Sequence, residues 1–239
     1  MKRLIILFFI LISLTGFDKY NRVSQKGLRI LFVGNSLTYT NDLPAMIKEI
    51  GELDGVTITY HSFLYPDYSL EDHWNDGKVK AEIEKNHYDF VVAQQGPSAL
   101  PESQVLLMES ARKLADLCNK HRTKLALYMV WPSKARAFDH DNVILSYTKA
   151  ANATSSLLCP AGQAWKYAWE KDPGLPLYSP DNFHPSVTGS VLAALTIYAA
   201  LIDKKRFDFI SLDKCSWKKN ISGEQLDVLK QAALRTLIK

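Results

Sequence analysis

The chain of 239 residues predicts a three-layer α/β/α fold, in which a flavodoxin-like parallel sheet of about five strands carries helices on both faces. Two observations lead to this class. Strand-like and helix-like segments alternate along the chain, and the strands are nearly continuous apolar runs. Such runs are typical of parallel strands that are covered by helices on both sides.

The expected strands are short segments rich in apolar and β-branched residues, and most are followed by glycine, proline or polar residues. The first ends at Gly34, directly before a polar loop. The predicted strands cover residues 29–33, 56–60, 89–93, 124–130 and 155–159.

The expected helices place apolar residues at helical spacing. Asn41 or Asp42 is a suitable cap for the first helix, and Pro185 suits the first turn of the fifth. With no repeat and no flexible linker in the sequence, we expect one domain over residues 27–239. The predicted helices cover residues 43–53, 69–85, 103–120, 141–154, 185–202 and 223–238.

The amino terminus has the pattern of a secretory signal. Lys2 and Arg3 precede an apolar run over residues 4–14, followed by Thr15 and Gly16. This run is shorter than the roughly 20 apolar residues of a spanning helix. We therefore expect a signal peptide at residues 1–20 and a secreted or periplasmic mature protein without a stable membrane span. An uncleaved N-terminal anchor is the alternative.

Charge, cysteines and motifs limit the possible functions. The net charge of +4 falls to about +2 without Lys2 and Arg3, which is too weak to indicate nucleic acid as a partner. Three cysteines leave at least one thiol unpaired, although a bridge such as Cys118–Cys215 is possible. No metal-binding spacing and no nucleotide-binding motif is present, so we expect no metal and no cofactor.

Polar loops follow the predicted strands, and ligands of such sheets bind beyond the carboxyl ends of the strands. Ser36 follows the first strand in a turn opened by Gly34, while Asp181 and His184 precede a late helix. A reactive serine needs a base, and the base needs an orienting group. Taken singly, each residue could equally cap a helix or begin a turn.

The combination of two motifs is more specific. The run G-N-S-L-T at residues 34–38 and the run D-N-F-H-P-S at residues 181–186 together resemble the SGNH hydrolases, also called GDSL-like esterases and lipases. The resemblance spans about residues 28–202. It implies that Ser36 is the nucleophile, that His184 is the general base and then acid, and that Asp181 orients His184.

The resemblance also implies an oxyanion hole, and here the chain departs from the family pattern. The backbone N–H of Ser36 would be one donor, but the usual G-x-N-D motif and the usual glycine of the second block are missing. In the third block we expect the Gln95 side chain as donor, with Gln94 as the second choice. In the second block we expect the backbone of Asp67 or Tyr68.

The segments at residues 159–165 and 177–189 are similar to those of carbohydrate-active members of the family. Aromatic and polar side chains in the strand-end loops also suit sugars and small acyl groups. We therefore expect a carboxylic ester hydrolase that removes O-acetyl groups from a small-molecule or polysaccharide ester. The alternatives are a thioesterase or lysophospholipase on the same triad, and a non-catalytic carbohydrate-binding protein. His73 is expected to be structural or to line a pocket.

Overall fold

The computed structural model describes residues 27–204, 207 and 210–237, so the predicted signal peptide lies outside the described residues. Within them, parallel strands form one five-stranded sheet in the order β2-β1-β3-β4-β5. This is the flavodoxin-like order, and it confirms the predicted fold class. The strands are β1 (Leu28–Gly34), β2 (Ile58–Leu64), β3 (Phe90–Ala93), β4 (Lys124–Tyr128) and β5 (Leu157–Cys159).

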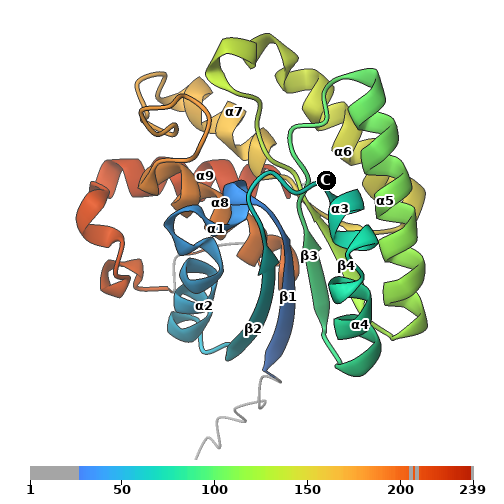
Figure 1. Ribbon diagram of the computed structural model, residues 1–239. Coiled ribbons are helices and arrows are strands. Elements are labelled where there is room, and N and C mark those ends of the chain that lie inside the picture. The colour runs from blue at the N-terminus through green and yellow to red at the C-terminus, as the bar shows by residue number, and fades with distance from the viewer. Residues whose placement is uncertain (1–26, 205–206, 208–209, 238–239) are drawn as a thin grey trace, which may run out of the picture.

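Helices cover both faces of this sheet (Figure 1). On one face lie α2 (Leu43–Leu53) and α8 (Val187–Leu201), with α7 (Ala161–Lys171) and α9 (Gly223–Arg235) packed on α8. The other face carries α3 (Leu70–Asn75), α4 (Lys78–Lys85), α5 (Pro101–Lys120) and α6 (His140–Thr154). The short elements are α1 (Ser36–Tyr39), η1 (Thr40–Asp42), η2 (Lys134–Asp139), η3 (Leu212–Lys214) and η4 (Lys218–Asn220).

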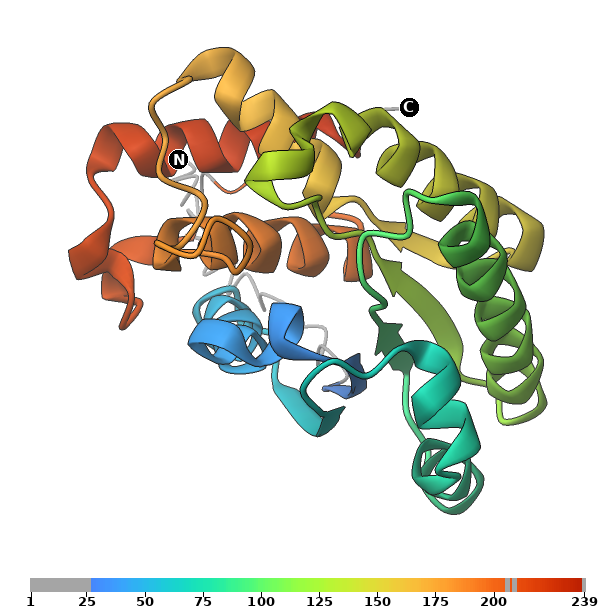
Figure 2. The ribbon, with the colours of Figure 1, turned by 45° about the horizontal axis from the view of Figure 1, so that its top comes forward.

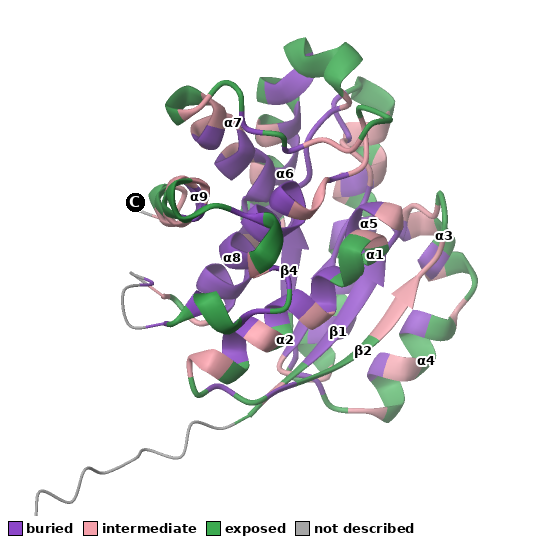
Figure 3. Ribbon diagram, turned by 90° about the vertical axis from the view of Figure 1, so that its left-hand side faces the viewer, coloured by how far each residue is buried: buried purple, intermediate pink, exposed green. Residues whose placement is uncertain are grey.

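Several elements have other bounds than the sequence predicts, and the two largest differences have a local reason. The helix expected at residues 69–85 is two helices, because Gly77 adopts a left-handed conformation (φ 75°) between α3 and α4. The strand expected at residues 56–60 begins later and extends to Leu64. It is an edge strand with an exposed middle (Figure 3), so its apolar pattern is weak. Helix α7 was not predicted.

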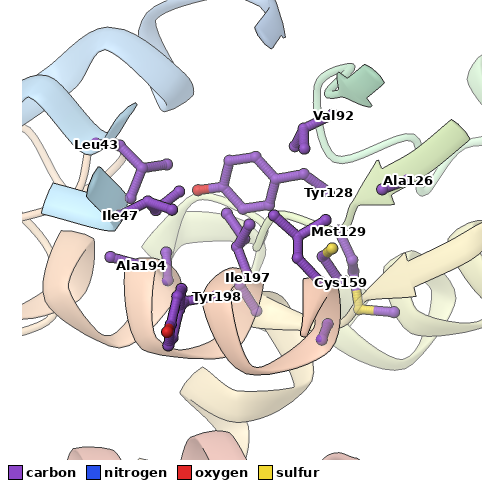
Figure 4. Close-up of a cluster of buried hydrophobic side chains, with 14 of the residues drawn as sticks. Leu43, Ile47, Val92, Ala126, Tyr128, Met129, Cys159, Ala194, Ile197 and Tyr198 are labelled. Atoms are coloured by element: carbon purple, nitrogen blue, oxygen red, sulfur yellow. The ribbon is translucent and has the colours of Figure 1, made fainter. Parts of the chain in front are cut away.

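The core between the sheet and α2 and α8 is built from large side chains of several elements (Figure 4). Tyr128, at the end of β4, is fully buried among side chains that include Leu43, Ile47 and Ile197. Its hydroxyl donates to the backbone oxygen of Leu37, 3.3 Å away in α1. The core therefore reaches directly beneath the turn that carries Ser36.

All three cysteines are buried and unpaired, so the possible bridge between Cys118 and Cys215 is not formed. Burial raises the pKa of each thiol to about 12. The thiols of Cys118, Cys159 and Cys215 are therefore protonated near neutral pH, and they act as small apolar groups.

Helix α8 makes a close approach to the segment that precedes its own amino terminus. A Cβ atom at Gly189 would lie 2.2 Å from the backbone oxygen of Leu177 and 2.6 Å from the indole of Trp165. The same Leu177 oxygen accepts the N–H of Ser186, the N-cap of α8, at 2.8 Å. Glycine at position 189 thus lets the loop of residues 177–186 lie flat against the helix.

We expect Gly189→Ala to lower the free energy of unfolding by about 1–3 kcal/mol, because the added methyl group must displace backbone or a buried ring. Urea denaturation of the purified protein measures this change. Gly223→Ala, at the start of α9, is the matched control, since nothing lies within 4 Å of a Cβ atom there. Equal stability of the two variants would contradict the close approach at α8.

Candidate active site

Ser36 is the first residue of α1, directly beyond the carboxyl end of β1. The side chain of Asn35 caps this helix by accepting the N–H of Leu37 at 3.1 Å, and it donates to the backbone oxygen of Tyr68 at 3.0 Å. The N–H of Ser36 has no acceptor among the described residues. It is therefore available to a ligand.

A buried glutamine fixes this turn from below. The side-chain oxygen of Gln94 accepts the N–H of Asn35 at 3.0 Å and the hydroxyl of Thr38 at 2.8 Å. A Cβ atom at Gly34 would lie 2.6 Å from that same oxygen. Position 34 needs glycine because the amide of a residue 60 positions later lies directly against the backbone.

Ser36, His184 and Asp181 form a continuous line of hydrogen bonds. The Nε2 atom of His184 lies 2.8 Å from the Oγ atom of Ser36. The Nδ1 atom of the same ring lies 2.6 Å from Oδ2 of Asp181. The structure thus brings together the three residues that the motifs singled out. In this arrangement Nδ1 carries the proton, and Nε2 can accept one from the serine.

Asp181 is oriented by donors rather than by burial, since about half of its side chain (51%) is exposed. Its Oδ1 atom accepts the hydroxyl of Ser179 at 2.7 Å and the N–H groups of Phe183 and His184, both at 2.9 Å. These bonds, with the contact to the His184 ring, hold the pKa of Asp181 well below its usual value. The carboxylate therefore stays ionised near neutral pH.

Asn41 connects the segment of Ser36 to the segment of His184. Its side-chain nitrogen donates to the backbone oxygen of Pro185 at 3.1 Å and lies 2.9 Å from the hydroxyl of Ser190 in α8. The sequence offered Asn41 or Asp42 as the cap of α2, and the structure uses Asp42. Both residues have positive φ angles (59° and 53°), a strained conformation that non-glycine residues adopt rarely.

A pocket of about 480 Å³ opens beside Ser36. In Figure 2, α1 lies near the middle of the view, at the carboxyl edge of the sheet, where the loops that follow the strands converge. The walls of the pocket combine apolar side chains, such as Leu106 and Phe183, with polar groups, such as Ser98 and Arg136. The guanidinium of Arg136 is also paired with Asp139.

The residues expected to form the oxyanion hole are placed less simply. The amide of Gln94 donates to the backbone oxygen of Gln95 at 2.6 Å. The amide of Gln95 donates to Ser98 Oγ at 3.1 Å and to the backbone oxygen of Ser103 at 3.4 Å. Both side chains are buried, and these bonds use amide hydrogens that a ligand would need. The two glutamines therefore fix the loop after β3 in this structure.

Two backbone N–H groups of the pocket, by contrast, have no acceptor within the described part of the chain. Asp67 and Gly96 line the pocket together with Ser36, and neither of their N–H groups has an acceptor among the described residues. Asp67 has a positive φ angle of 59°. Tyr68, the other residue considered in this loop, donates its N–H to Tyr65 at 3.4 Å and lines the same pocket.

Sequence reasoning missed the role of Tyr147 in this site. Its buried hydroxyl donates to the backbone oxygen of Gln95 at 2.6 Å and accepts the N–H of Gln95 at 3.2 Å. The residue lies 52 positions away in α6, where its pattern is that of an ordinary core residue. No local signal in the sequence could have indicated it.

His73 is buried and supports the turn of Ser36 from α3. Its Nε2 atom lies 2.8 Å from the backbone oxygen of Gly34, and its Nδ1 atom has no partner among the described residues. The ring therefore donates from Nε2 as a neutral imidazole. Burial lowers the pKa of His73. The expectation of a structural role agrees with these contacts.

No group of three or more His, Cys, Asp or Glu side chains is arranged to hold a metal ion within the described residues. None of the helices in the described part of the chain has the length and apolarity needed to cross a bilayer.

Comparison with solved structures gives many matches, while no family model and no curated protein matches the chain. A candidate SGNH hydrolase from Slackia heliotrinireducens is 26% identical, with a TM-score of 0.61 over 74% of this chain and 100% of the other. A DUF4886 family protein from Bacteroides uniformis is 18% identical, with a TM-score of 0.69 over 89% and 95%.

A third match is an acetyl xylan esterase from Geobacillus stearothermophilus, 15% identical, with a TM-score of 0.54 over 75% of this chain and 94% of the other. The chain has the fold of the SGNH hydrolases, which confirms the resemblance drawn from its two motifs. Together the matches support a carboxylic ester hydrolase.

We expect Asn41→Asp to lower kcat for 4-nitrophenyl acetate by about tenfold or more with little change in KM. A carboxylate cannot donate to the Pro185 oxygen, and small displacements of reacting groups are costly. Asp42→Asn is the control, because it changes the neighbouring charge and retains an oxygen that can cap α2. A kcat equal to that of the native protein would show that the Asn41 contact does not position His184.

We expect the native protein to lose stability as pH falls from 7 to 5, partly through His73. Its folded pKa lies below the unfolded value of about 6.5, so its contribution is present above that pH and is lost as pH falls. His73→Gln keeps an N–H donor but does not titrate. Its urea midpoint should therefore depend less on pH, and an unchanged dependence would contradict this assignment. Buried His140 is present in both proteins, so its contribution to the pH dependence of stability cancels in the comparison.

Proposed function

We propose that this protein is a secreted serine ester hydrolase that removes O-acetyl or similarly short acyl groups from carbohydrate. The observation that carries the proposal is the hydrogen-bonded line from Ser36 Oγ to His184 Nε2 and from His184 Nδ1 to Asp181. Nucleophilic acyl transfer requires these parts in this order: a hydroxyl, an imidazole with one unprotonated nitrogen, and an ionised carboxylate.

In the proposed reaction, His184 Nε2 takes the hydroxyl proton as Ser36 Oγ attacks the ester carbonyl. The resulting oxyanion would accept the N–H of Ser36, with the N–H groups of Asp67 and Gly96 as the further donors we propose. His184 then gives its proton to the leaving alcohol. A water molecule, deprotonated by His184, cleaves the acyl-enzyme by the same steps. No step requires a metal.

The polar residues in the lining of the pocket support a short acyl group. Its walls are interrupted by polar groups, including Ser69, Ser98 and Arg136, so they do not form a continuous apolar channel for a long chain. Asp67 and Ser103 add further polar groups to this lining. These features favour a deacetylase over a lysophospholipase or a long-chain thioesterase on the same residues.

A carbohydrate-binding protein without activity is the other function that the sequence leaves open. It would have no need for a serine hydroxyl 2.8 Å from an imidazole whose other nitrogen contacts a carboxylate. The side-chain amides of Gln94 and Gln95 donate within the protein and so are not side-chain donors for an oxyanion. The unpaired backbone N–H groups beside Ser36 can replace them.

We expect the mature protein to hydrolyse 4-nitrophenyl acetate, and Ser36→Ala to lower kcat/KM by about 10³ or more. Asp181→Asn should also lower it strongly, because the ring loses its carboxylate partner. Ser133→Ala is the matched control, since this serine caps η2 without a side-chain hydrogen bond. Activity should fall on the acid side as a histidine, rather than a carboxylate, takes up a proton.

Two results would contradict this function. Equal activity of the native and Ser36→Ala proteins would exclude the serine mechanism. A higher kcat/KM for 4-nitrophenyl octanoate than for the acetate would favour the thioesterase or lysophospholipase alternative over the deacetylase.

A further inference from the structure

A second pocket, of about 470 Å³, lies next to the site of Ser36. The residues that line it come from η2, from the end of α7 and from the loop that carries Asp181 and His184. They include Lys134, Ala137, Trp169, Leu175, Tyr178 and Asn182.

The two pockets are neighbours because the same two segments form walls of both. From η2, Arg136 lines the first pocket, whereas Lys134 and Ala137 line the second. From the loop that carries Asp181 and His184 (the triad loop), Phe183 lines the first pocket and Asn182 lines the second. The backbone N–H of Lys134 donates to the backbone oxygen of Asn182 at 2.9 Å. This bond joins the two segments into one ridge between the pockets.

The aromatic side of the second pocket is fixed in place. The ring centroids of Trp169 and Tyr178 are 5.5 Å apart, with 35° between their planes. The Trp169 indole donates to the backbone oxygen of Leu175 at 3.0 Å, and the Tyr178 hydroxyl donates to that of Pro132 at 2.6 Å. Because the polar atoms of both rings already have partners, the rings offer the pocket apolar surface in a fixed orientation.

The polar side of the same pocket has unused hydrogen-bonding groups. Lys134 is exposed, and its ammonium group has no ion-pair partner within the described part of the chain. Asn182 is exposed, and its side-chain amide likewise has no hydrogen-bond partner there. A pocket with rigid aromatic surface on one side and free donors on the other matches a sugar ring, which has apolar C–H faces and a rim of hydroxyl groups.

We propose that the second pocket binds a sugar residue of the glycan whose acylated residue reacts at Ser36. This inference rests on the proposed function and extends it to a substrate class: an oligosaccharide or polysaccharide that crosses the ridge, rather than an acylated monosaccharide. A small ester such as 4-nitrophenyl acetate would occupy the first pocket alone.

The test compares substrates of increasing length. We would measure kcat/KM for O-acetylated xylo-, cello- and chito-oligosaccharides of one to six sugars, beside 4-nitrophenyl acetate. The variants are Lys134→Ala and Asn182→Gly, the latter chosen because Asn182 has a positive φ angle of 59° that glycine adopts freely. Lys113→Ala, an exposed lysine of α5 outside both pockets, is the control.

We expect kcat/KM of the native protein to rise by about tenfold or more with chain length in at least one series, as a second contact region adds affinity. Both pocket variants should lose most of this rise through KM, with 4-nitrophenyl acetate hydrolysis within about twofold of native. No dependence on length in any series, or equal losses on the small and long substrates, would overturn the proposal.

A binding measurement separates failure of the subsite from failure of the proposed function. Ser36→Ala protein, alone and combined with Lys134→Ala, is titrated with the unacetylated six-sugar members while tryptophan fluorescence is recorded. Binding that Lys134→Ala weakens would support the subsite even if no ester were hydrolysed. Binding that Lys134→Ala leaves unchanged, or absence of binding by all three sugars, would overturn it whatever the activity.

Discussion

The Ser36 hydroxyl and the His184 imidazole lie 148 positions apart in the chain, and their atoms are 2.8 Å apart. Much of the structure at the carboxyl edge of the sheet holds this contact in place. Ser36 follows β1, an interior strand of the sheet, whereas His184 lies on a loop that precedes α8. The two are brought together because α2, which follows Ser36, and α8 pack side by side on one face of the sheet. The distance between the reacting atoms is therefore set by the packing of two helices.

Asn41 shows how that packing is transmitted to the site. It lies between α1 and α2 and donates to Pro185, the residue after His184. Two successive positive φ angles accompany this contact. Conformational strain of this kind persists only where surrounding contacts fix it, and here the contacts join the two halves of the site. The strain is thus the structural consequence of turning sharply from α1 into α2 while keeping the amide aimed at α8.

The buried glutamines explain why this chain departs from the family pattern without losing the site. A buried amide without partners destabilises a protein by about 1–3 kcal/mol, so both side chains must be satisfied internally. Gln94 is satisfied by the turn of Ser36, and Gln95 by the loop after β3. Tyr147 closes the network from α6. In the proposed reaction, stabilisation of the developing oxyanion would fall to backbone N–H groups of the loop that these glutamines hold in place.

The sequence was sufficient for features that depend on local pattern. Buried parallel strands are apolar throughout, so β1, β3 and β4 could be recognised, and the two end motifs placed Ser36, Asp181 and His184. Features that depend on distant partners could not be recognised. The edge strand β2 has three consecutive exposed residues, so its apolar signal is weak. The use of Gln94 as a support beneath Gly34, and of Tyr147 behind Gln95, follows from contacts across 50 or more positions.

The exposure of the triad loop bears on how such a site changes its substrate. Asp181 is held by a serine hydroxyl and two backbone N–H groups within its own loop, so its orientation depends little on the core. Most residues that line the two pockets lie on this loop and the segment before it, on η2 and on the loops after β2 and β3. These segments can vary while the sheet and the α2–α8 contact remain. Solved structures with this fold and low identity, among them an acetyl xylan esterase and a lipase/acylhydrolase, are what such an arrangement allows. Under the proposed function, substrate choice would depend on η2 and on residues 173–183, outside the layers that position the serine.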